Sequence, residues 1–122
     1  MKEITAIIRT NKIQKTKDAL AAAGYPQVTV KDVLGRGKQR GLQHEFCHEL
    51  PEPGDDGESP GVSFIPKRMI TLVAGESEID KLVELLINVN QTGNVGDGKI
   101  IVSPVSDAIR IRTGEAGQAA LL

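Results

Sequence analysis

A strand–helix–strand pattern over residues 3–34 recurs over residues 69–112, with an unpatterned stretch between the two copies. Two consecutive units of this kind form the split βαβ, or ferredoxin-like, arrangement, in which both helices pack on one face of a sheet. A chain of 122 residues suits one core and one domain. We therefore expect a single α+β domain, residues 1–122, whose second sheet face needs cover from other copies of the chain, as in a homotrimer.

The spacing of apolar residues and the residues that can begin or end a helix indicate where the two helices lie. The first helix is expected between Asn11, which can cap a helix, and Gly24, which can end one. The second is expected over residues 76–90, with Ser77 as its cap. Its apolar residues recur at the spacing of one helix face, namely Ile79, Leu82, Val83 and Leu86.

Two short strands are expected after the second helix, at Lys99–Val102 and Ile109–Arg112, with Pro104 between them. Arg110 and Arg112 alternate with isoleucines in the last of these segments. On a strand both guanidinium groups would point to the same face. This arrangement favours anion binding, although a solvated strand face would show the same alternation.

Residues 37–65 interrupt both periodicities and are expected to form a long loop between the second and third strands. They contain five glycines and three prolines, which is typical of a segment outside the core. Between Gln43 and Gly61 there are six acidic residues and no lysine or arginine. Loops of this length are commonly functional. A partner-binding loop is therefore predicted, with a solvated acidic insertion as the alternative.

Charge and cysteine content limit the possible partners and compartments. The net charge of −1 provides no overall field to attract nucleic acid. No apolar run approaches the ~20 residues of a membrane span, and the run near the N-terminus is too short for a signal peptide. Cys47 is the only cysteine, which excludes an intrachain disulfide and fits a reducing compartment. We expect a cytoplasmic protein without membrane insertion.

The glycine-rich run over residues 92–99 carries the strongest chemical signal in the chain. Gly93, Gly96 and Gly98 allow tight turns that bring backbone N–H groups close to an anion. Lys99 adds a positive charge for phosphate oxygens. The run is therefore predicted to bind phosphate, and a tight helix-to-strand connection with exposed charges is the alternative.

The same run has the spacing G-x-x-x-x-G-K of a nucleotide-hydrolysing P-loop. Two features argue against that function. Ile100 stands where the P-loop requires a hydroxyl for magnesium, and here a helix precedes the glycines and a strand follows them. Phosphate binding is compatible with both features, whereas P-loop hydrolysis is not.

A second glycine cluster, Gly35–Gly41, reads G-x-G-x-x-x-G and misses the dinucleotide-binding pattern by one residue. Its lysine, arginine and glutamine suit the rim of a phosphate or carboxylate site.

His44, Cys47 and His48 lie close together in the sequence, but a structural zinc site needs four ligands and the chain has no other Cys or His. Cys47 is flanked by acidic residues, which do not activate a thiol. No catalytic triad or pair of catalytic carboxylates is evident elsewhere. The chain is therefore not expected to be an enzyme.

Several segments together resemble the PII family of signal-transduction proteins, and the resemblance covers nearly the whole chain. The most specific of them are Gln91–Ile100 and Ile109–Glu115. The others are Met1–Ile4, Ala6–Arg9, Val33–Gly41 and Pro66–Lys67.

The resemblance implies a trimer with ATP or ADP in clefts between subunits, residues 92–99 as the phosphate loop, and residues 37–65 as the family's long T-loop. It implies that nucleotide contacts come from Thr29, Gly35, Arg36, Gly37, Lys38, Gln39, Thr92, Gly93, Gly96, Asp97, Gly98, Lys99, Arg110 and Arg112.

In the family, magnesium–ATP recruits 2-oxoglutarate as an effector. The resemblance places the Mg²⁺ contact at Gln39 and a carboxylate contact at Lys67. The implied effector site consists of Gln39, Arg40, Gly41 and Lys67.

The chain departs from the family's pattern in the loop. The family's uridylylated loop tyrosine has no counterpart, because the only tyrosine is Tyr25. The long acidic loop and the segment Phe64–Met69 are similar to the second member of the paired, nitrogenase-linked PII-like regulators of methanogenic archaea. That similarity implies inhibition of dinitrogenase, relieved by 2-oxoglutarate, by a homotrimer or a mixed assembly with a sister chain. The alternatives are another target, such as an ammonium channel, and a slow ATPase.

Overall fold

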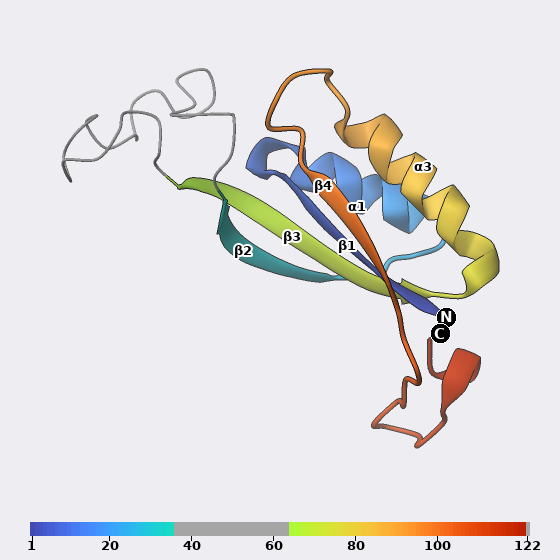
Figure 1. The fold of residues 1–122 in the computed structure, drawn as a ribbon. Helices are drawn as coiled ribbons and strands as arrows, with labels where there is room; N and C mark the ends of the chain where they lie inside the picture. The colour runs from blue at the N-terminus through green and yellow to red at the C-terminus, as the bar shows by residue number, and fades with distance from the viewer. Residues whose placement is uncertain (36–63, 122) are drawn as a thin grey trace.

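The computed structural model describes residues 1–35 and 64–121. Figure 1 shows the strands side by side, with the two helices above them. The strands are β1 (Lys2–Arg9), β2 (Thr29–Gly35), β3 (Ile65–Ala74) and β4 (Lys99–Pro104), the helices are α1 (Ile13–Ala22) and α3 (Ile79–Asn90), and the 3₁₀ segments are η1 (Thr10–Lys12), η2 (Glu76–Glu78) and η3 (Gly117–Leu121).

The four strands form one antiparallel sheet in the order β2-β3-β1-β4. Each half of the chain contributes a central and an edge strand, and both helices cover the same face of the sheet (Figure 1). This is the predicted α+β, ferredoxin-like arrangement, and the prediction is confirmed. No helix in the described parts of the chain is long and apolar enough to span a membrane.

The core lies between the sheet and the two helices. Alternate residues of β1 and β3 face the helices, because successive strand side chains point to opposite faces. Burying these aliphatic side chains is the main driving force for the fold. The core includes Ile4, Ala6 and Ile8 from β1, Ile70 and Leu72 from β3, Leu20 from α1, and Leu82 and Leu86 from α3, each at most 4% exposed.

A buried polar pair fixes the end of α3, where the glycine-rich run begins. Asn90 Nδ2 donates to Thr16 Oγ1 of α1 at 3.1 Å and to the Leu86 carbonyl at 3.0 Å. Thr16 in turn donates to the Lys12 carbonyl at 2.8 Å. Buried polar groups cost free energy unless they are hydrogen-bonded, so this pairing specifies how the last turn of α3 sits against α1.

Both helices begin with a short 3₁₀ turn, which changes the role of the predicted caps. Asn11 lies inside η1, and Lys12 occupies the N-cap position of α1 without a side-chain hydrogen bond. Ser77 lies inside η2, and Glu78 occupies the N-cap position of α3, again without one. The predictions of Asn11 and Ser77 as caps are therefore wrong, because the 3₁₀ turns move each helix start beyond them.

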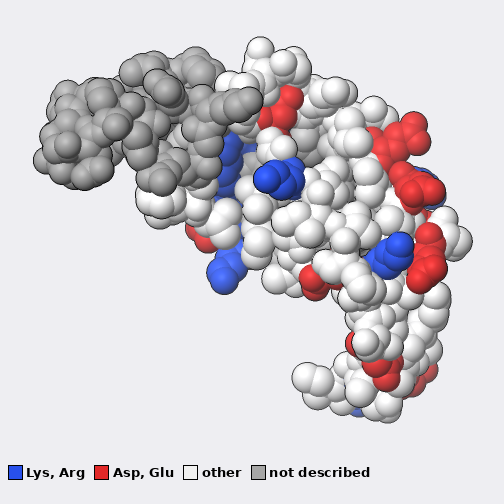
Figure 2. Space-filling view, viewed as in Figure 1, with Lys and Arg blue, Asp and Glu red and all other residues white. Residues whose placement is uncertain are grey.

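The predicted strand at Ile109–Arg112 is also wrong. Ile109 forms only an isolated bridge with Ala116, and the chain turns immediately after Arg110. The Arg110 N–H donates to the Glu115 carbonyl at 2.9 Å, and the Gly114 N–H donates to the Arg110 carbonyl at 2.7 Å. This C-terminal hairpin, residues 107–117, belongs to the segment that projects from the body of the molecule in Figures 1 and 2.

Candidate functional site

The glycine-rich run connects α3 to β4, so a helix precedes it and a strand follows it, as predicted. Its position is set at one end by the buried Asn90 and at the other by pairing of Lys99 with Ile7 of β1. The loop therefore lies at the end of the sheet where β1 finishes and β3 begins.

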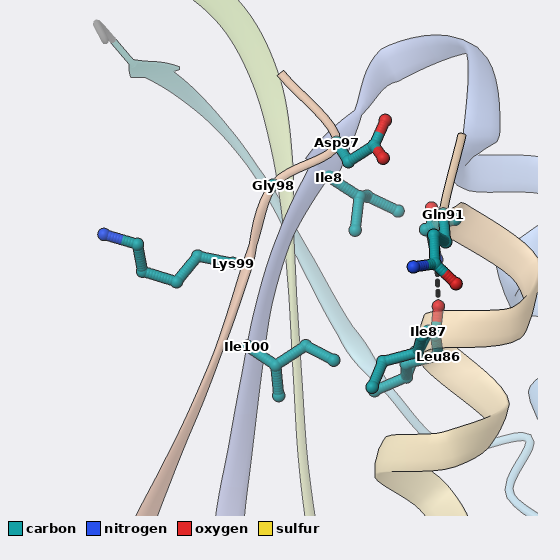
Figure 3. Close-up of a pocket in the computed structure, with 9 residues that line it drawn as sticks. Ile8, Leu86, Ile87, Gln91, Asp97, Gly98, Lys99 and Ile100 are labelled. Carbon is teal, nitrogen blue, oxygen red and sulfur yellow. Dashed lines mark hydrogen bonds between the residues drawn. The ribbon is translucent and has the colours of Figure 1, made fainter. Parts of the chain in front are cut away.

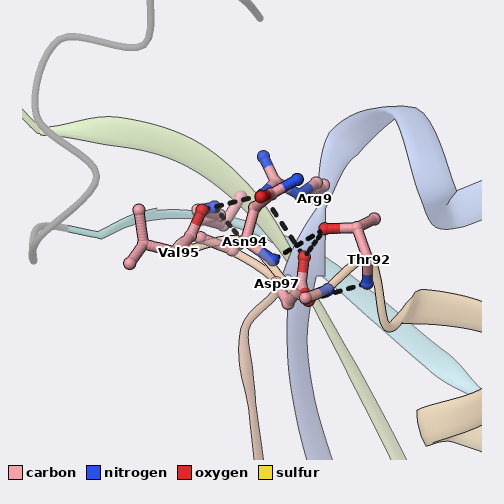
Figure 4. A network of polar contacts seen from close by, with 8 residues as sticks. Arg9, Thr92, Asn94, Val95 and Asp97 are labelled. Atoms are coloured by element: carbon pink, nitrogen blue, oxygen red, sulfur yellow. Dashed lines mark hydrogen bonds and ion pairs between the residues drawn. The ribbon is translucent and has the colours of Figure 1, made fainter.

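Asp97 organises the first half of this loop (Figure 4). Its Oδ2 accepts hydrogen bonds from the N–H groups of Thr92 at 2.7 Å and Gly93 at 2.9 Å, and its Oδ1 accepts one from the Thr92 hydroxyl. The Thr92 Oγ1 accepts a further bond from the Asn94 N–H at 3.2 Å. The N–H groups of Thr92 and Gly93 thus point to the protein's own carboxylate. Asp97 therefore stabilises the geometry of the loop.

The hydrogen bonds to Asp97 stabilise its ionised form. Burial by itself would raise the pKa of this carboxyl, but the bonds from Thr92, Gly93 and Arg9 outweigh burial and lower its pKa from 3.8 to about 2. A group whose pKa is depressed on folding stabilises the folded state at pH values above its unfolded pKa.

Asp97→Asn should therefore lower the free energy of unfolding by about 1–2 kcal/mol at neutral pH. The difference from wild type should shrink as the pH falls from about 4 towards 2, because the wild-type carboxylate is then protonated. Urea unfolding of both proteins at several pH values measures this. A difference that stays constant down to pH 2 would contradict the role of the charge.

Gly98 allows the loop to touch the backbone of β1. Its φ is +111°, and a Cβ placed there would lie 1.9 Å from the Ile7 carbonyl oxygen. A residue with a side chain would overlap that oxygen, so only glycine fits. The close approach brings Lys99 directly into the ladder with β1.

Lys99 extends away from α3, on the opposite side of β4 from Ile100 (Figure 3). A cavity of about 200 Å³ lies on the helix side, lined mainly by apolar residues that include Ile8, Leu86, Ile87 and Ile100. The Lys99 ammonium group points out of this cavity. The charge of Lys99 is therefore presented on the sheet face that the helices leave uncovered.

Two further cations hold the second half of the loop, and Arg9 is one that the sequence prediction missed. Arg9 Nη2 donates to the Val95 carbonyl at 2.8 Å and lies 3.3 Å from Asp97 Oδ1 (Figure 4). Lys67 Nζ donates to the Gly96 carbonyl at 2.8 Å. Arg9 and Lys67 are 6% and 7% exposed. The only sequence signal for Arg9 is a charged residue at the end of an apolar strand.

The register of the sheet explains why these cations meet. Arg9 of β1 stands opposite Lys67 of β3, and both lie on the same sheet face as Lys99, because Ile7 pairs with Met69 and with Lys99. The predicted effector lysine and the predicted phosphate loop are thus adjacent.

The remaining predicted ligand residues are distributed unevenly. Gly35 lies beside Lys67, whose Cγ would be 3.6 Å from a Cβ at Gly35. Thr29 lies at the other end of β2, about 20 Å along the strand at ~3.3 Å per residue. Arg36, Gly37, Lys38, Gln39, Arg40 and Gly41, as well as His44, Cys47 and His48, lie outside the described residues.

Arg110 and Arg112 do not form the predicted same-face pair, because their segment is a hairpin and not a strand. Arg110 Nη1 lies 2.6 Å from Glu115 Oε1, and its Nη2 donates to the Ala119 carbonyl at 2.6 Å. Arg112 lies in the turn and is exposed. Within one chain this hairpin is remote from the glycine-rich run (Figure 1).

No group of three or more His, Cys, Asp or Glu side chains within residues 1–35 and 64–121 is arranged to hold a metal. The predicted Mg²⁺ contact, Gln39, is not among these residues.

A comparison with protein-family models matches residues 1–115 to a family described as "Nitrogen regulatory protein P-II". This chain belongs to the PII family. PII proteins are regulators and not enzymes, and the chain is accordingly a nitrogen regulatory protein of the PII type.

Relatives from methanogens are similar to this PII protein over their whole length. The "Nitrogen fixation nifHD1 region GlnB-like protein 2" of Methanosarcina barkeri is 45% identical over 122 residues, covering 99% of each chain. The corresponding nifHD-region protein of Methanothermobacter marburgensis is 46% identical over 121 residues, covering 99% of this chain and 100% of the relative. These names link similar proteins to the nitrogen-fixation region.

A solved structure of Arabidopsis thaliana PII bound to citrate has the same fold, with a TM-score of 0.74 and 32% identity. The similarity covers 98% of this chain and 88% of the plant chain.

Proposed function

We propose that this PII protein binds ATP or ADP at residues 92–99 and 2-oxoglutarate beside them, and thereby controls a partner protein through residues 37–65. The observation that carries the proposal is the gathering of Arg9, Lys67 and Lys99 on one end of the uncovered sheet face. Among residues 1–35 and 64–121, these three cations share that end with one carboxylate, Asp97. Such an excess of positive charge suits the anionic groups of a nucleotide and a dicarboxylate.

The two ligands require different parts of this end. The ammonium group of Lys99 is exposed and extends from the glycine-rich run, as a contact to phosphate oxygens requires. Lys67 is buried next to Gly35, which lies four residues before Gln39, the first residue of the segment expected to contact the effector. A carboxylate bound there would be shielded from water, which strengthens the ion pair.

A complete nucleotide site is proposed to need a second copy of the chain. Thr29, Arg110 and Arg112 lie far from the glycine-rich run within one chain. The uncovered face also carries apolar residues, among them Ile7, Met69 and the 45% exposed Ile101. A homotrimer would cover this face and bring the missing residues to a neighbouring loop, and a mixed assembly with a sister chain would do the same.

Mg²⁺ would be held through Gln39 and oxygens of the ligands. Asp97, the carboxylate of the glycine-rich run, already accepts hydrogen bonds from Thr92, Gly93 and Arg9. It is thus committed to the loop and is not offered to an ion. When bound, the ion would neutralise charge between the nucleotide phosphates and the effector.

Titration calorimetry of 2-oxoglutarate, with and without magnesium–ATP, tests this function. We expect 2-oxoglutarate to bind much more tightly when magnesium–ATP is present. Failure of either ligand to bind at millimolar concentration would contradict the proposal. A slow ATPase is the rival function, and steady release of phosphate well above trace rates would favour it, although Ile100 follows Lys99 where a P-loop has a hydroxyl.

Lys99→Ala should weaken ATP binding about 10- to 100-fold, because a hydrogen bond to a charged group contributes about 1.5–3 kcal/mol. The matched control is Lys81→Ala, which removes an exposed lysine from α3. Calorimetry of ATP with both variants measures the difference. Equal affinities for the two variants would exclude Lys99 from the phosphate site.

The partner is proposed to be dinitrogenase, inhibited by this protein until 2-oxoglutarate binds. The support comes from the acidic sequence between Gln43 and Gly61 and from relatives named for the nitrogen-fixation region. Affinity purification from nitrogen-fixing cells should recover dinitrogenase, and the amount should fall when magnesium–ATP and 2-oxoglutarate are added. Recovery of an ammonium channel instead would identify the alternative target.

A further inference from the structure

Arg9 and Lys67 donate hydrogen bonds to two consecutive carbonyl groups of the glycine-rich run. Arg9 Nη2 binds the Val95 carbonyl and Lys67 Nζ binds the Gly96 carbonyl, each at 2.8 Å. The two cations come from different strands, whereas the carbonyls are neighbours in the loop. The loop is thus attached to both central strands of the sheet.

The position of Arg9 opposite Lys67 is electrostatically unfavourable. Like charges that face each other across a sheet repel, and burying a charge is costly unless it is paired and hydrogen-bonded. Arg9 and Lys67 face each other and are both at least nine-tenths buried. The glycine-rich run provides groups that help to offset these costs, namely the Asp97 carboxylate and the carbonyls of Val95 and Gly96. The conformation of the loop and the positions of the two cations therefore depend on each other.

The bond to Gly96 also orients Lys67. An ammonium group has three donors, so the bond from Lys67 to the Gly96 carbonyl is compatible with Lys67 also contacting a carboxylate. When the loop is ordered, the Gly96 carbonyl fixes the direction of Nζ in advance. When the loop is loose, binding a carboxylate must also order the lysine, which costs affinity.

We propose that Arg9 is a positioning residue that couples the two ligand sites by holding the glycine-rich run, through Val95 and Asp97, in the shape that orients Lys67. This inference rests on the proposed function and specifies how one ligand promotes binding of the other. A nucleotide that orders the loop prepares Lys67 for 2-oxoglutarate. By reciprocity, 2-oxoglutarate must strengthen nucleotide binding by the same factor.

The test compares Arg9→Met with wild type in a calorimetric cycle. The affinity for magnesium–ATP is measured with and without saturating 2-oxoglutarate, and the ratio of the two affinities is the coupling factor. Coupling factors of about 5–150 are typical, and Arg9→Met should lower the factor at least about fivefold. Arg9→Lys, which keeps a positive charge and donors on a shorter side chain, should retain an intermediate factor.

Arg68→Met is the matched control. Arg68 follows Lys67 on β3, but its side chain lies on the helix-covered face and forms an ion pair with Asp32 at 2.9 Å. Its substitution should therefore leave the coupling factor unchanged. Hydrogen exchange of the ligand-free proteins gives an independent measurement. The amides of residues 95–98 should exchange faster in Arg9→Met than in wild type or Arg68→Met. Circular dichroism verifies that each variant is folded.

Two outcomes would overturn this inference and leave the proposed function intact. The first is an unchanged coupling factor in a folded Arg9→Met protein. The second is that Arg9→Met weakens each ligand equally when the other is absent, while the exchange of the amides of residues 95–98 is unchanged. A general structural defect would produce this result. If wild type binds neither ligand, the proposed function fails and the coupling fails with it.

Discussion

Gly98→Ala should abolish measurable ATP binding and lower the free energy of unfolding by about 2–5 kcal/mol. The left-handed backbone at φ +111° costs a residue with a side chain about 1–2 kcal/mol. The new Cβ would also lie 1.9 Å from the Ile7 carbonyl oxygen, so the loop and β1 must separate. Displacing packed groups in this way typically costs about 1–3 kcal/mol more. The separation would move Lys99 out of its ladder position opposite Ile7.

Gly93→Ala is the matched control for this result. Gly93 also has a positive φ, +87°, but nothing lies within 4 Å of a Cβ placed there. Gly93→Ala should therefore lower the free energy of unfolding only by the backbone cost of about 1–2 kcal/mol, and it should lose less ATP affinity than Gly98→Ala. Urea unfolding and calorimetry of both variants measure the contrast. Equal losses in the two variants would mean that contact with β1 is not what requires glycine at position 98.

Leu82→Ala should lower the free energy of unfolding by about 2–5 kcal/mol, because it leaves a cavity in the centre of the core. Leu82 is fully buried between α3 and the sheet, among side chains that include Ile4, Ile70 and Leu86. The lost contacts lie away from the glycine-rich run. The ATP affinity of the protein that remains folded should therefore change little.

Leu85→Ala is the control for Leu82→Ala, since Leu85 is on the same helix but only partly buried. Its effect should be clearly smaller. Both variants should be unfolded in urea at the same protein concentration as wild type, because association between copies also contributes to stability. An equally small effect in both variants would place the stabilising contacts outside this core.

Much of the fold could be predicted because the decisive signals are local. The apolar period of α3 and the β-branched segments of β1 and β3 identify a helix and strands from neighbouring residues alone. The failed predictions depended on geometry that sequence patterns do not contain. Alternation predicted a strand at Ile109–Arg112, where the hydrogen bonds of Arg110 with Glu115 and Ala119 close a hairpin instead.

The candidate site likewise combines residues that the sequence predicted with one that it did not. Gly98, Lys99 and Lys67 were predicted, the first two from the glycine-lysine pattern and Lys67 from the resemblance to the PII family. Arg9 was not predicted, because it contacts the glycine-rich run only through the fold. Its hydrogen bond to Val95 joins residues that are 86 positions apart in the sequence. Only the antiparallel pairing of β1 with β3 and β4 brings these groups together.

By itself the sequence determined the order of elements, the aliphatic core and the chemistry available in residues 92–99, because composition and period act over short distances. The tertiary structure decided how that chemistry is used. Asp97 turns inward to accept the N–H groups of Thr92 and Gly93, and Arg9 and Lys67 meet across two strands to hold the same loop. Sheet register and burial determine which groups form these hydrogen bonds, and both arise only when distant segments pack together.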